Sequence, residues 1–400
     1  MIRLSFVGDV MCEHTRLDSF RNAEGAYDFA PLFAGVEEEF RRSDLVVANL
    51  ETPLAGEALG YSRKNYSFNT PEQMAFAMKH AGVHAVSTAN NHVLDRGVEG
   101  LEKTLETLDA AGLLHTGSAR TEEEAKPITA DVRGVRIGLL SYTYGTEACY
   151  NGHYLKPEEA YRVNLLREQE LRNPVRRYFA VSNRFFPRAL RAVYRRVMPK
   201  RAARPVGELR ERDGRQKERL LRDIAYAKEH SDFTVLCLHC GGQFNEAPTK
   251  YTEEIADFCL DHGADAVVGN HEHRIQISRF GDFRRPVAYC LGNFTSDYGI
   301  DRKPFDKNAD CSVLLHLYLD EETKKLAEIG FGILISVRGE DGVIVTKLLS
   351  ECAARAGEDA REALAEKNTA AVNAFLGTDF DRVEPREEYL VSQMTGRTGL

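Results

Sequence analysis

The sequence predicts an α/β fold with two sheets. Two observations favour it: apolar strand-like runs alternate with helical periods along most of the chain, and the part beyond about residue 290 is rich in strands without intervening helices. A third observation, that several apolar runs end in metal-ligating residue types, suggests that these strand ends share one edge of a sheet. At 400 residues, the chain is long enough for one large domain or two ordinary ones. It contains no internal repeat.

The first block of alternation runs to about residue 142. Apolar runs bounded by turn residues predict strands, and apolar residues at helical spacing, such as Leu101, Leu105 and Leu108, predict helices. A hairpin is expected around Arg133-Gly134. The predicted elements are strands at Leu4–Val7, Leu45–Ala48, Val83–Thr88, Ile128–Val132 and Val135–Tyr142, with helices at Pro71–His80 and Val98–Ala111.

The second block begins near residue 213. Its pattern predicts helices at Arg215–His230 and Tyr251–His262. It also predicts strands at Phe233–Leu238, Ala266–Val268, Val313–Leu319, Phe331–Val337 and Val343–Lys347. Residues 353–376 have a helical pattern, and the final polar stretch is expected to be loosely held. We therefore predict one domain over residues 1–350, followed by a C-terminal helical extension and tail over 351–400.

The bulk charge excludes one broad class of partner. The formal net charge is −8, so there is no global attraction to nucleic acid, and no nucleic-acid partner is expected. The N-terminal run MIRLSFVGDVM lacks the long apolar core of a secretory signal, and no run approaches the roughly 20 apolar residues that span a bilayer. These features predict a cytoplasmic protein.

Eight cysteines are scattered along the chain. Several lie in apolar runs, which indicates reduced core thiols and not a disulfide framework. Cys237 and Cys240 form a C-x-x-C pair, but no second pair follows at zinc-ribbon spacing. We interpret Cys237 as a buried strand residue; a redox or zinc role for the pair is the less favoured alternative.

Five predicted strands end in residues that bind metals. One such residue is unremarkable, since a lone histidine after a strand is usually structural. Five strand ends that all carry Asp, Glu, Asn or His indicate a shared site, and mixed carboxylate, amide and imidazole donors suit one or two divalent Mn, Fe or Zn ions. A carboxylate that bridges two ions is typical of centres that act on phosphoryl groups. The candidate metal ligands are Asp9, Glu51, Asn91, His239, His271 and His273.

The motifs around these residues make the comparison specific. They are GDVM at 8–11, NLETPL at 49–54, ANNHVLDRG at 89–97, HCGGQFNEAP at 239–248, VVGNHEH at 267–273 and YCLGNFTSD at 289–297. In this order they closely resemble the CapA (poly-γ-glutamate capsule biosynthesis) family of the calcineurin-like metallophosphatase superfamily. The resemblance implies a four-layer α/β/β/α sandwich, here with a basic helical insertion. It also implies that Asp9 is the first metal aspartate and that Glu51 is the bridging carboxylate.

The resemblance further assigns His92 as a catalytic histidine that contacts the substrate or leaving group. Asp95 follows three residues later and either holds the His92 imidazole in one tautomer or caps the helix from Val98. Asn293 either bonds a metal ligand or makes a turn, with the turn favoured. Glu13 and His14, just past Asp9, are expected in a solvated loop.

The chain departs from related motifs at three places. Position 11 is Met, where classical phosphatases have a metal-binding His; CapA proteins share this feature. The usual HWGxEY reads HCGGQF, and the usual GHHPH reads GNHEH with Asn270 and Glu272. The candidate metal ligands survive these changes, whereas contacts to the substrate are expected to differ.

A basic segment interrupts the predicted domain at about residues 161–212. Between Tyr161 and Leu220 there are 18 Arg and Lys against six Asp and Glu, a local net charge of +12. Phe185, Phe186 and Val193 lie among the arginines, which is typical of a basic amphipathic helix. The segment either packs on the acidic body or contacts an anionic polymer or a membrane surface peripherally.

Two classes of function remain after these observations. The first is a CapA-type metal-dependent hydrolase that acts on a phosphoester or a related anionic substrate, small or polymeric. The alternative is a non-catalytic metal-containing subunit that binds an anionic polymer or membrane in capsule synthesis. Hydrolysis of a γ-glutamyl or other amide bond is a third, weaker reading.

Overall fold

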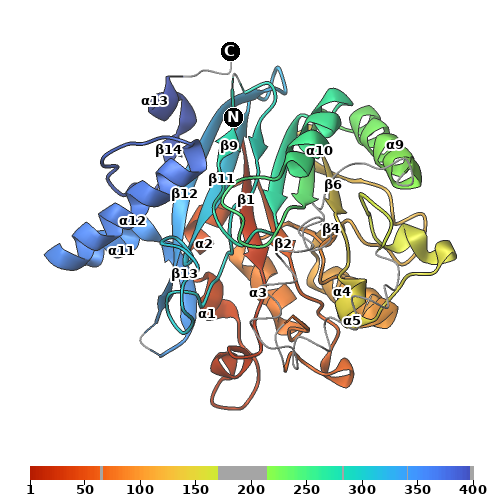
Figure 1. Ribbon diagram of the computed structural model, residues 1–400, viewed down its shortest axis with the longest axis horizontal. Helices are drawn as coiled ribbons and strands as arrows, with labels where there is room; N and C mark the ends of the chain where they lie inside the picture. The colour runs from red at the N-terminus through yellow and green to blue at the C-terminus, as the bar shows by residue number, and fades with distance from the viewer. Residues whose placement is uncertain (64–65, 170–213, 282, 340, 397–400) are drawn as a thin grey trace, which may run out of the picture.

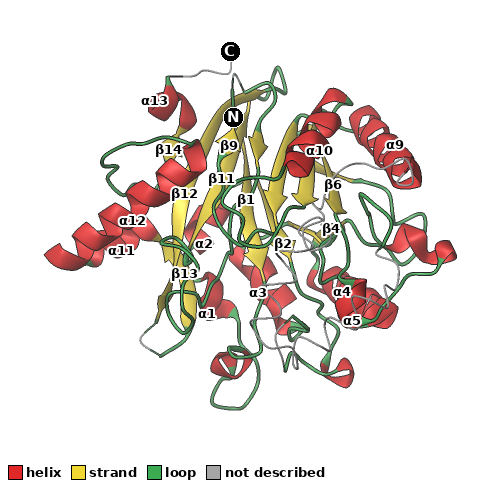
Figure 2. Ribbon diagram, viewed as in Figure 1, coloured by secondary structure: helices red, strands yellow, loops and turns green. Residues whose placement is uncertain are grey.

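We analysed a computed structural model of the chain, which describes residues 1–63, 66–169, 214–281, 283–339 and 341–396. Its strands form two sheets. The first has the order β13-β12-β11-β1-β2-β3-β4, with β14 paired to β12, and the second has the order β5-β6-β7-β8-β10-β9. Figure 2 shows the strands in the centre of the molecule and helices around them.

The strands of the first sheet are β1 (Ile2–Val10), β2 (Leu45–Leu50), β3 (Ala85–Ser87), β4 (Leu114–Thr116), β11 (Cys311–Leu319), β12 (Leu326–Arg338), β13 (Ile344–Leu348) and β14 (Tyr389–Leu390). Those of the second are β5 (Ile128–Val132), β6 (Val135–Thr143), β7 (Phe233–His239), β8 (Ala266–Asn270), β9 (Ser278–Arg279) and β10 (Val287–Ala288). The α-helices are α1 (Ala30–Phe33), α2 (Glu37–Arg41), α3 (Gln73–Ala81), α4 (Gly97–Ala111), α5 (Ala148–Asn151), α9 (Gly214–His230), α10 (Lys250–Asp261), α11 (Leu349–Arg355), α12 (Glu358–Leu376) and α13 (Val391–Thr395).

Alternation along the strands produces the layers. Ile2, Leu4 and Phe6 of β1 belong to a core cluster that also contains Val235 and Cys237 of β7, so this cluster lies between the two sheets. On the outer face of the first sheet, β2 residues pack with α3 and α4; on the outer face of the second, β7 residues pack with α9 and α10. Burying each large apolar side chain stabilises the fold by about 1.5–3 kcal/mol. These layers confirm the predicted α/β/β/α class.

The parallel pairing of strands in both sheets determines where the candidate site lies. In the first sheet β1, β2, β3 and β4 are parallel neighbours, and in the second β6, β7 and β8 are. Their carboxyl ends therefore share one edge in each sheet. This geometry brings the polar residues that follow β1, β2, β3, β7 and β8 to one end of the sandwich, as the sequence predicted.

The C-terminal part differs from the expectation of a loosely held tail. Phe375 of α12 packs against Phe331 of β12 with ring centroids 4.9 Å apart, and it belongs to the core between the sheets. Beyond α12, the strand β14 pairs with β12, and Tyr389 is buried. That expectation was wrong because the polar composition of the tail hides a few well-spaced apolar anchors. Figure 1 shows α11 and α12 alongside β12, and α13 at the upper end, next to β14.

Most of the predicted basic insertion, residues 170–213, lies outside the described residues. Residues 161–169, at its predicted start, are described and contact the body of the domain. Val163, Leu165 and Leu166 are buried, and Val163 and Leu165 form bridges to Ser118 and Thr143 of the body. Among the described residues, no helix is long and apolar enough to cross a bilayer.

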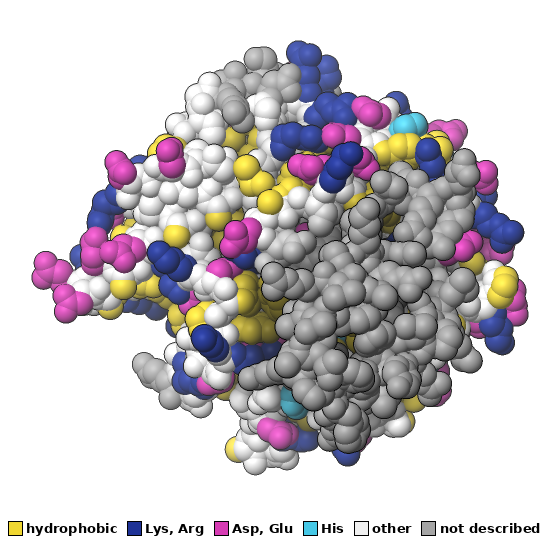
Figure 3. Space-filling view, in the orientation of Figure 1, with side chains coloured by type: hydrophobic (Ala, Val, Ile, Leu, Met, Phe, Trp, Pro, Cys, Tyr) yellow, Lys and Arg dark blue, Asp and Glu magenta, His cyan; other side chains and the backbone are white. Residues whose placement is uncertain are grey.

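Acidic and basic side chains are interspersed on the visible part of the face in Figure 3. Around α10 they form ion pairs: Arg279 lies 2.5 Å from Asp257, and Arg285 lies 2.6 Å from Asp261. Pairs this exposed contribute about 0–1 kcal/mol each. In this region of the described surface, the charges largely neutralise one another.

A buried polar cluster at the other end of β1 gives a prediction about pH. His316 Nδ1 on β11 lies 2.8 Å from Ser5 Oγ, and the ring lies beside Arg3. Burial, and then the Arg3 charge, lower the pKa of His316 well below its usual range. The unfolded chain binds a proton at this histidine below about pH 6.5 and the folded chain does not, so stability falls as the pH drops below that value.

Between about pH 5 and 6, we expect the free energy of unfolding to depend less steeply on pH in His316→Gln than in the native chain, by about 1.4 kcal/mol per pH unit. Urea unfolding of both proteins across this pH range measures the difference. Parallel curves for the two proteins would show that His316 is protonated in the folded state.

Candidate metal centre

All six predicted ligands converge at the shared strand edge. Asp9 lies near the end of β1, Glu51 follows β2, and His239 ends β7; Asn91 lies in the loop after β3, and His271 and His273 follow β8. Every one of them is buried, and His273 is the most exposed at 7 %. The site therefore combines carboxylates and an amide from the first sheet with imidazoles from the second.

One group of donors surrounds His239. Its Nε2 lies 2.8 Å from Asn91 Oδ1, 3.2 Å from His271 Nδ1 and 3.4 Å from Glu51 Oε1. Burial lowers the pKa of His239 to about 3, and burial also lowers the pKa of His271 well below its usual range. Both imidazoles are therefore neutral at pH 7, as metal ligation requires.

A second group surrounds His273. Its Nδ1 lies 2.9 Å from Asn293 Oδ1, 3.3 Å from Asp9 Oδ2 and 3.7 Å from Glu51 Oε2. The two oxygens of Glu51 thus face different groups, Oε1 toward His239 and Oε2 toward His273. A carboxylate in this position can bridge two cations.

Only one of the four carboxylate oxygens of Asp9 and Glu51, Asp9 Oδ1, accepts a hydrogen bond from a described residue. Asp9 Oδ2 and both oxygens of Glu51 are buried, and none of the residues that the structure describes donates a hydrogen bond to them. Burial, and then the neighbouring Asp9, raise the pKa of Glu51 well above its usual range. Burial also raises the pKa of Asp9, but hydrogen bonding and the charge of His273 outweigh it, so the net shift is downward. A buried, unpartnered carboxylate pair is costly unless a cation compensates it, so these residues fit one or two divalent ions.

Further side chains hold the ligands in place. Asn49 donates to Asp9 Oδ1 at 2.7 Å and lies 3.3 Å from His239 Nδ1, and Ser87 donates to Asn49 Oδ1 at 2.8 Å. Such outer contacts orient metal ligands. The sequence analysis missed Asn49, although it is a polar residue inside the apolar strand β2, which is a usable signal. Asn293 bonds His273, so the turn reading that we favoured for it was wrong.

The backbone at the site is constrained. His271 has φ 112° and His273 φ 60°, in the left-handed region that bulky residues seldom adopt. Gly8 lets β1 approach the loop around Gly292, because a Cβ there would lie 1.8 Å from the Gly292 oxygen. Asp9 and Asn293 form a bridge at this close approach. Strain of this kind is concentrated at functional sites.

His92 and Asp95 form a buried pair next to the six ligands. His92 Nδ1 lies 2.8 Å from Asp95 Oδ2, which also accepts the Phe68 N–H at 2.7 Å. The helix α4 begins at Gly97 with Arg96 as its N-cap and no side-chain cap, so Asp95 does not cap it. Since Nδ1 is engaged, the other ring nitrogen of His92 is left to face the pocket that this residue lines.

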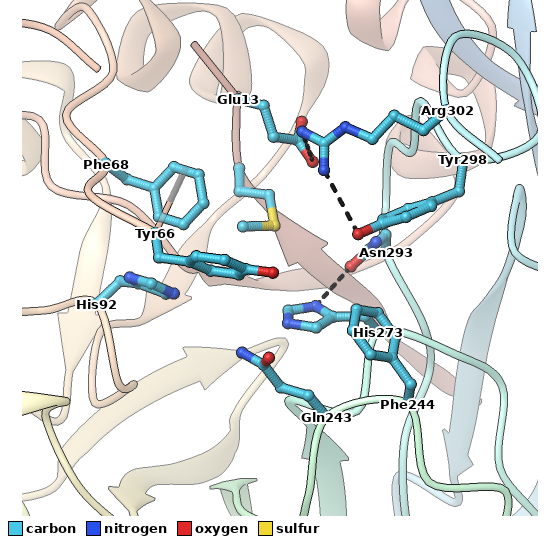
Figure 4. Close-up of a pocket in the computed structure, with 11 residues that line it drawn as sticks. Glu13, Tyr66, Phe68, His92, Gln243, Phe244, His273, Asn293, Tyr298 and Arg302 are labelled. Carbon is cyan, nitrogen blue, oxygen red and sulfur yellow. Dashed lines mark hydrogen bonds and ion pairs between the residues drawn. The ribbon is translucent and has the colours of Figure 1, made fainter. Parts of the chain in front are cut away.

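That pocket opens beside the candidate metal centre and holds about 450 Å³ of space, part of it continuous with solvent. Met11, His92, His273 and Asn293 are among its lining residues; aromatic side chains and Arg302 surround them (Figure 4). Glu13 also lines the pocket and is only 6 % exposed. The expectation that Glu13 lies in a solvated loop was therefore wrong, whereas His14 is half-buried.

The motif departures have structural counterparts. Glu272 is fully buried, and within the described part of the chain neither of its carboxylate oxygens has a hydrogen-bond partner. Gly241, in the neighbouring loop, has φ 137°, and a Cβ there would lie 1.8 Å from Glu272 Oε1. The glycine thus makes room for the glutamate. Cys237 and Cys240 are buried free thiols whose pKa burial raises to about 12, as expected for inert core cysteines.

Sequence comparisons agree with this geometry. A family model described as "Bacterial capsule synthesis protein PGA_cap" matches residues 3–298. The chain is 28 % identical over 321 residues to "Uncharacterized protein y4sH" of Sinorhizobium fredii, covering 73 % of this chain and 65 % of that protein.

Two relatives from Bacillus carry more informative names. "Capsule biosynthesis protein CapA" of Bacillus anthracis is 24 % identical over 310 residues, covering 75 % of this chain and 61 % of that protein. "PGA biosynthesis protein CapA" of Bacillus subtilis is 26 % identical over 310 residues, covering 76 % and 65 %. The chain spans somewhat less than two thirds of the length of these curated relatives. With the family model matched over most of its length, the chain belongs to the PGA_cap family of bacterial capsule synthesis proteins, within the metallophosphatase-like superfamily.

Proposed function

We propose that the protein is a metal-dependent hydrolase that acts on a phosphoester or a related anionic substrate. The observation that carries the proposal is the position of Glu51, which presents one carboxylate oxygen to each of two groups of donors. His273, in one of these groups, lines an open pocket. Asp9, Glu51 and His273 would hold one ion, and Glu51, Asn91, His239 and His271 would hold the other. Their mixed nitrogen and oxygen donors suit Mn, Fe or Zn.

Bound divalent ions would polarise the scissile group and lower the pKa of a bound water. The chain itself supplies the proton transfer. With Nδ1 of His92 held by Asp95 at 2.8 Å, the imidazole is fixed in one orientation and can donate a proton to the leaving oxygen from its other nitrogen. Burial of this pair excludes water from the carboxylate side of the imidazole.

We further propose that this activity serves capsule or poly-γ-glutamate biosynthesis, on the strength of the names of the Bacillus relatives. A second candidate is a non-catalytic subunit that binds an anionic polymer through the same centre. Met11 favours it, because this residue lines the pocket beside His273 and offers no oxygen or nitrogen donor to an ion. The two candidates differ in turnover and not in metal content.

The test is to purify the full chain without chelator, measure its metals by mass spectrometry, and assay p-nitrophenyl phosphate, bis-p-nitrophenyl phosphate and γ-glutamyl p-nitroanilide. We expect one to two equivalents of a divalent ion, together with hydrolysis of a phosphate ester that chelation abolishes and added metal restores. Bound metal without turnover of any ester would favour the binding subunit. Cleavage of the anilide alone would favour amide hydrolysis.

Removing the metal is expected to destabilise the fold. At a metal concentration of 100 times Kd, binding stabilises the native state by about 2.7 kcal/mol per site. We therefore expect the thermal midpoint to fall by several degrees after chelation and to recover when the ion is added back. A midpoint that does not respond to chelator would mean that the six residues hold no ion in solution.

A further inference from the structure

We infer that the pocket beside the candidate metal centre binds an aromatic ring in the leaving group of the substrate. The inference rests on the proposed function for the position of the phosphoryl group. It goes further because it assigns the class of group that leaves and the residues that select it. These residues are Phe68, Phe244, Tyr298, Arg302 and Tyr66, which line one pocket although they lie far apart in the sequence (Figure 4).

One wall of the pocket is a packed aromatic cluster. The ring centroids of Phe244 and Tyr298 lie 5.9 Å apart at 73°, and Phe305 packs against both, at 4.5 Å and 4.9 Å. Phe244 also lies 5.8 Å from the ring of His273. The wall thus begins at the candidate metal centre and continues outward. Aromatic walls favour a flat ring over an alkyl group of the same size, because rings gain additional stabilisation from stacked or edge-to-face contact.

The opposite wall carries His92. Phe68 packs edge-on against the His92 ring with centroids 4.4 Å apart, and Tyr66 stands nearby with 59 % of its surface exposed. Figure 4 shows Tyr66, Phe68 and His92 on one side of the pocket and Phe244, Tyr298 and Arg302 on the other. A group held between these walls lies next to the imidazole that would protonate a leaving oxygen.

The backbone supports a binding role for two of the rings. Tyr66 has φ 57° and Phe244 has φ 65°. Bulky residues are rare in this left-handed region, where each costs about 1–3 kcal/mol unless the surroundings enforce it. Eight non-glycine residues have positive φ among those described, and three of them, Tyr66, Phe244 and His273, line this one pocket.

Arg302 is positioned to donate hydrogen bonds to acceptor atoms on the edge of such a ring. Its Nε lies 2.8 Å from Asp297, and its guanidinium lies over the Tyr298 ring at 5.2 Å. One terminal nitrogen lies 3.4 Å from Tyr298 Oη and the other 3.9 Å from Glu13 Oε1, and both distances are long for a hydrogen bond. These nitrogens can donate to an acceptor on a ligand.

The charges around Arg302 indicate whether the bound ring is neutral or anionic. Glu13 and Asp297 face Arg302, and Arg16 pairs with Glu13 at 3.6 Å. Two carboxylates therefore offset two guanidinium groups. This balance favours a neutral ring that carries hydrogen-bonding atoms over a second anionic group.

The step assigned to this pocket is hydrolysis of one ester bond. The oxygen of a water bonds to phosphorus, the bond from phosphorus to the ring-bearing oxygen breaks with its electron pair, and that oxygen takes a proton from His92. The proton that the water loses passes to solvent, and His92 regains from solvent the proton that it gave, so the net change is that the ester and water become an alcohol and a phosphate. The aromatic alcohol then leaves from the space between the two walls.

Two matched pairs of ligands test the inference on the metal-loaded full chain. The first is benzylphosphonate against cyclohexylmethylphosphonate, neither of which can be hydrolysed. The second is adenosine 5′-monophosphate against ribose 5-phosphate, which differ by the base. We expect the ring to tighten binding by about tenfold in at least one pair, as measured by calorimetry or by inhibition constants. Discrimination in the second pair would identify a nucleoside, and discrimination in the first pair alone a smaller aryl group. Equal affinity within both pairs would overturn the inference.

Variants locate the effect. Phe244→Leu and Tyr298→Leu should reduce the ring preference to about twofold or less, while Phe76→Leu, at a half-exposed position on α3, should leave it unchanged. Methylphosphonate affinity should be the same in all three variants, which shows that the metal centre is intact. Ring preference that survives both pocket variants would also overturn the inference. Because the phosphonates need no turnover, a protein that prefers rings but hydrolyses no ester would refute the proposed function alone.

Discussion

Replacing Glu51 by Gln is expected to give the largest effect of any single substitution, a loss of both metal and hydrolysis. Glu51 presents Oε1 to His239 and Oε2 to His273, and it belongs to both sets of described residues that are close enough together to hold an ion. Changes that only orient a metal ligand cost about 10–100-fold in affinity, so loss of this ligand should cost more than about 100-fold. Metal analysis and the phosphate ester assay measure the two losses.

The Glu51→Gln substitution should affect the stability of the metal-free protein and that of the metal-bound protein in opposite directions. Without metal, Glu51 is a buried carboxylate with no hydrogen bond, and its pKa is raised well above the usual range by burial and then by Asp9. A neutral amide removes that cost, so metal-free Glu51→Gln should be at least as stable as the metal-free native chain. With metal present, it should be less stable. Thermal unfolding with and without chelator checks this reversal.

Glu39→Gln is the matched control. Glu39 is also a buried carboxylate, on α2, but it pairs with Arg3 at 2.7 Å. Its replacement should destabilise the chain in both states and leave the metal content unchanged. If Glu51→Gln kept two equivalents of metal, the assignment of Glu51 as the shared ligand would be wrong.

Replacing His92 by Ala is expected to lower hydrolysis by about 10²–10⁴-fold with the metal content retained. His92 is held by Asp95 at 2.8 Å, and it does not belong to either group of donors around the candidate ions. A general acid matters most when the leaving group is poor. The loss should therefore be greater for phenyl phosphate than for p-nitrophenyl phosphate, a difference that a purely structural role would not produce.

Two further variants serve as comparisons for His92→Ala. In the native chain the Phe68 N–H donates to Asp95 at 2.7 Å, and the side-chain oxygen of Asn can accept the same bond. The Asp95→Asn variant should therefore fold, and its hydrolysis rate should fall by only about tenfold to 100-fold. His14→Ala, at a half-buried position beyond Asp9, should leave the rate unchanged. Loss of metal in His92→Ala would show that His92 is itself a ligand.

The sequence was sufficient to predict the α/β class and to bring together all six candidate ligands. Each ligand type follows an apolar run, and the carboxyl ends of parallel strands share an edge, so the residues that follow β1, β2 and β3 had to be neighbours. Helices such as α4 and α10 were predicted to within about two residues because their apolar periods are regular. Short elements such as α1, β4 and β14 have too few residues to establish a period, and we did not predict them.

What lay beyond the sequence depends on contacts between elements that are distant along the chain. Asn49, inside β2, contacts Asp9 through the pairing of β1 with β2, but it reaches His239 of the second sheet only because the two sheets meet at this edge. Glu13 is buried beside Arg16 and near Arg302, which lies much further along the chain. Likewise, the aromatic pocket joins residues from three separate loops, none of which has an aromatic run to mark it.

The sequence by itself determined which residue types stand at the strand ends and therefore the kind of chemistry available, since local apolar patterning decides where each strand stops. The tertiary structure alone decided how these residues divide into two groups. His239 and His273 come from the second sheet and Glu51 from the first, so the contacts of each Glu51 oxygen depend on how the two sheets pack across the core between them. That packing arises from many side chains far from the site, and no local pattern encodes it.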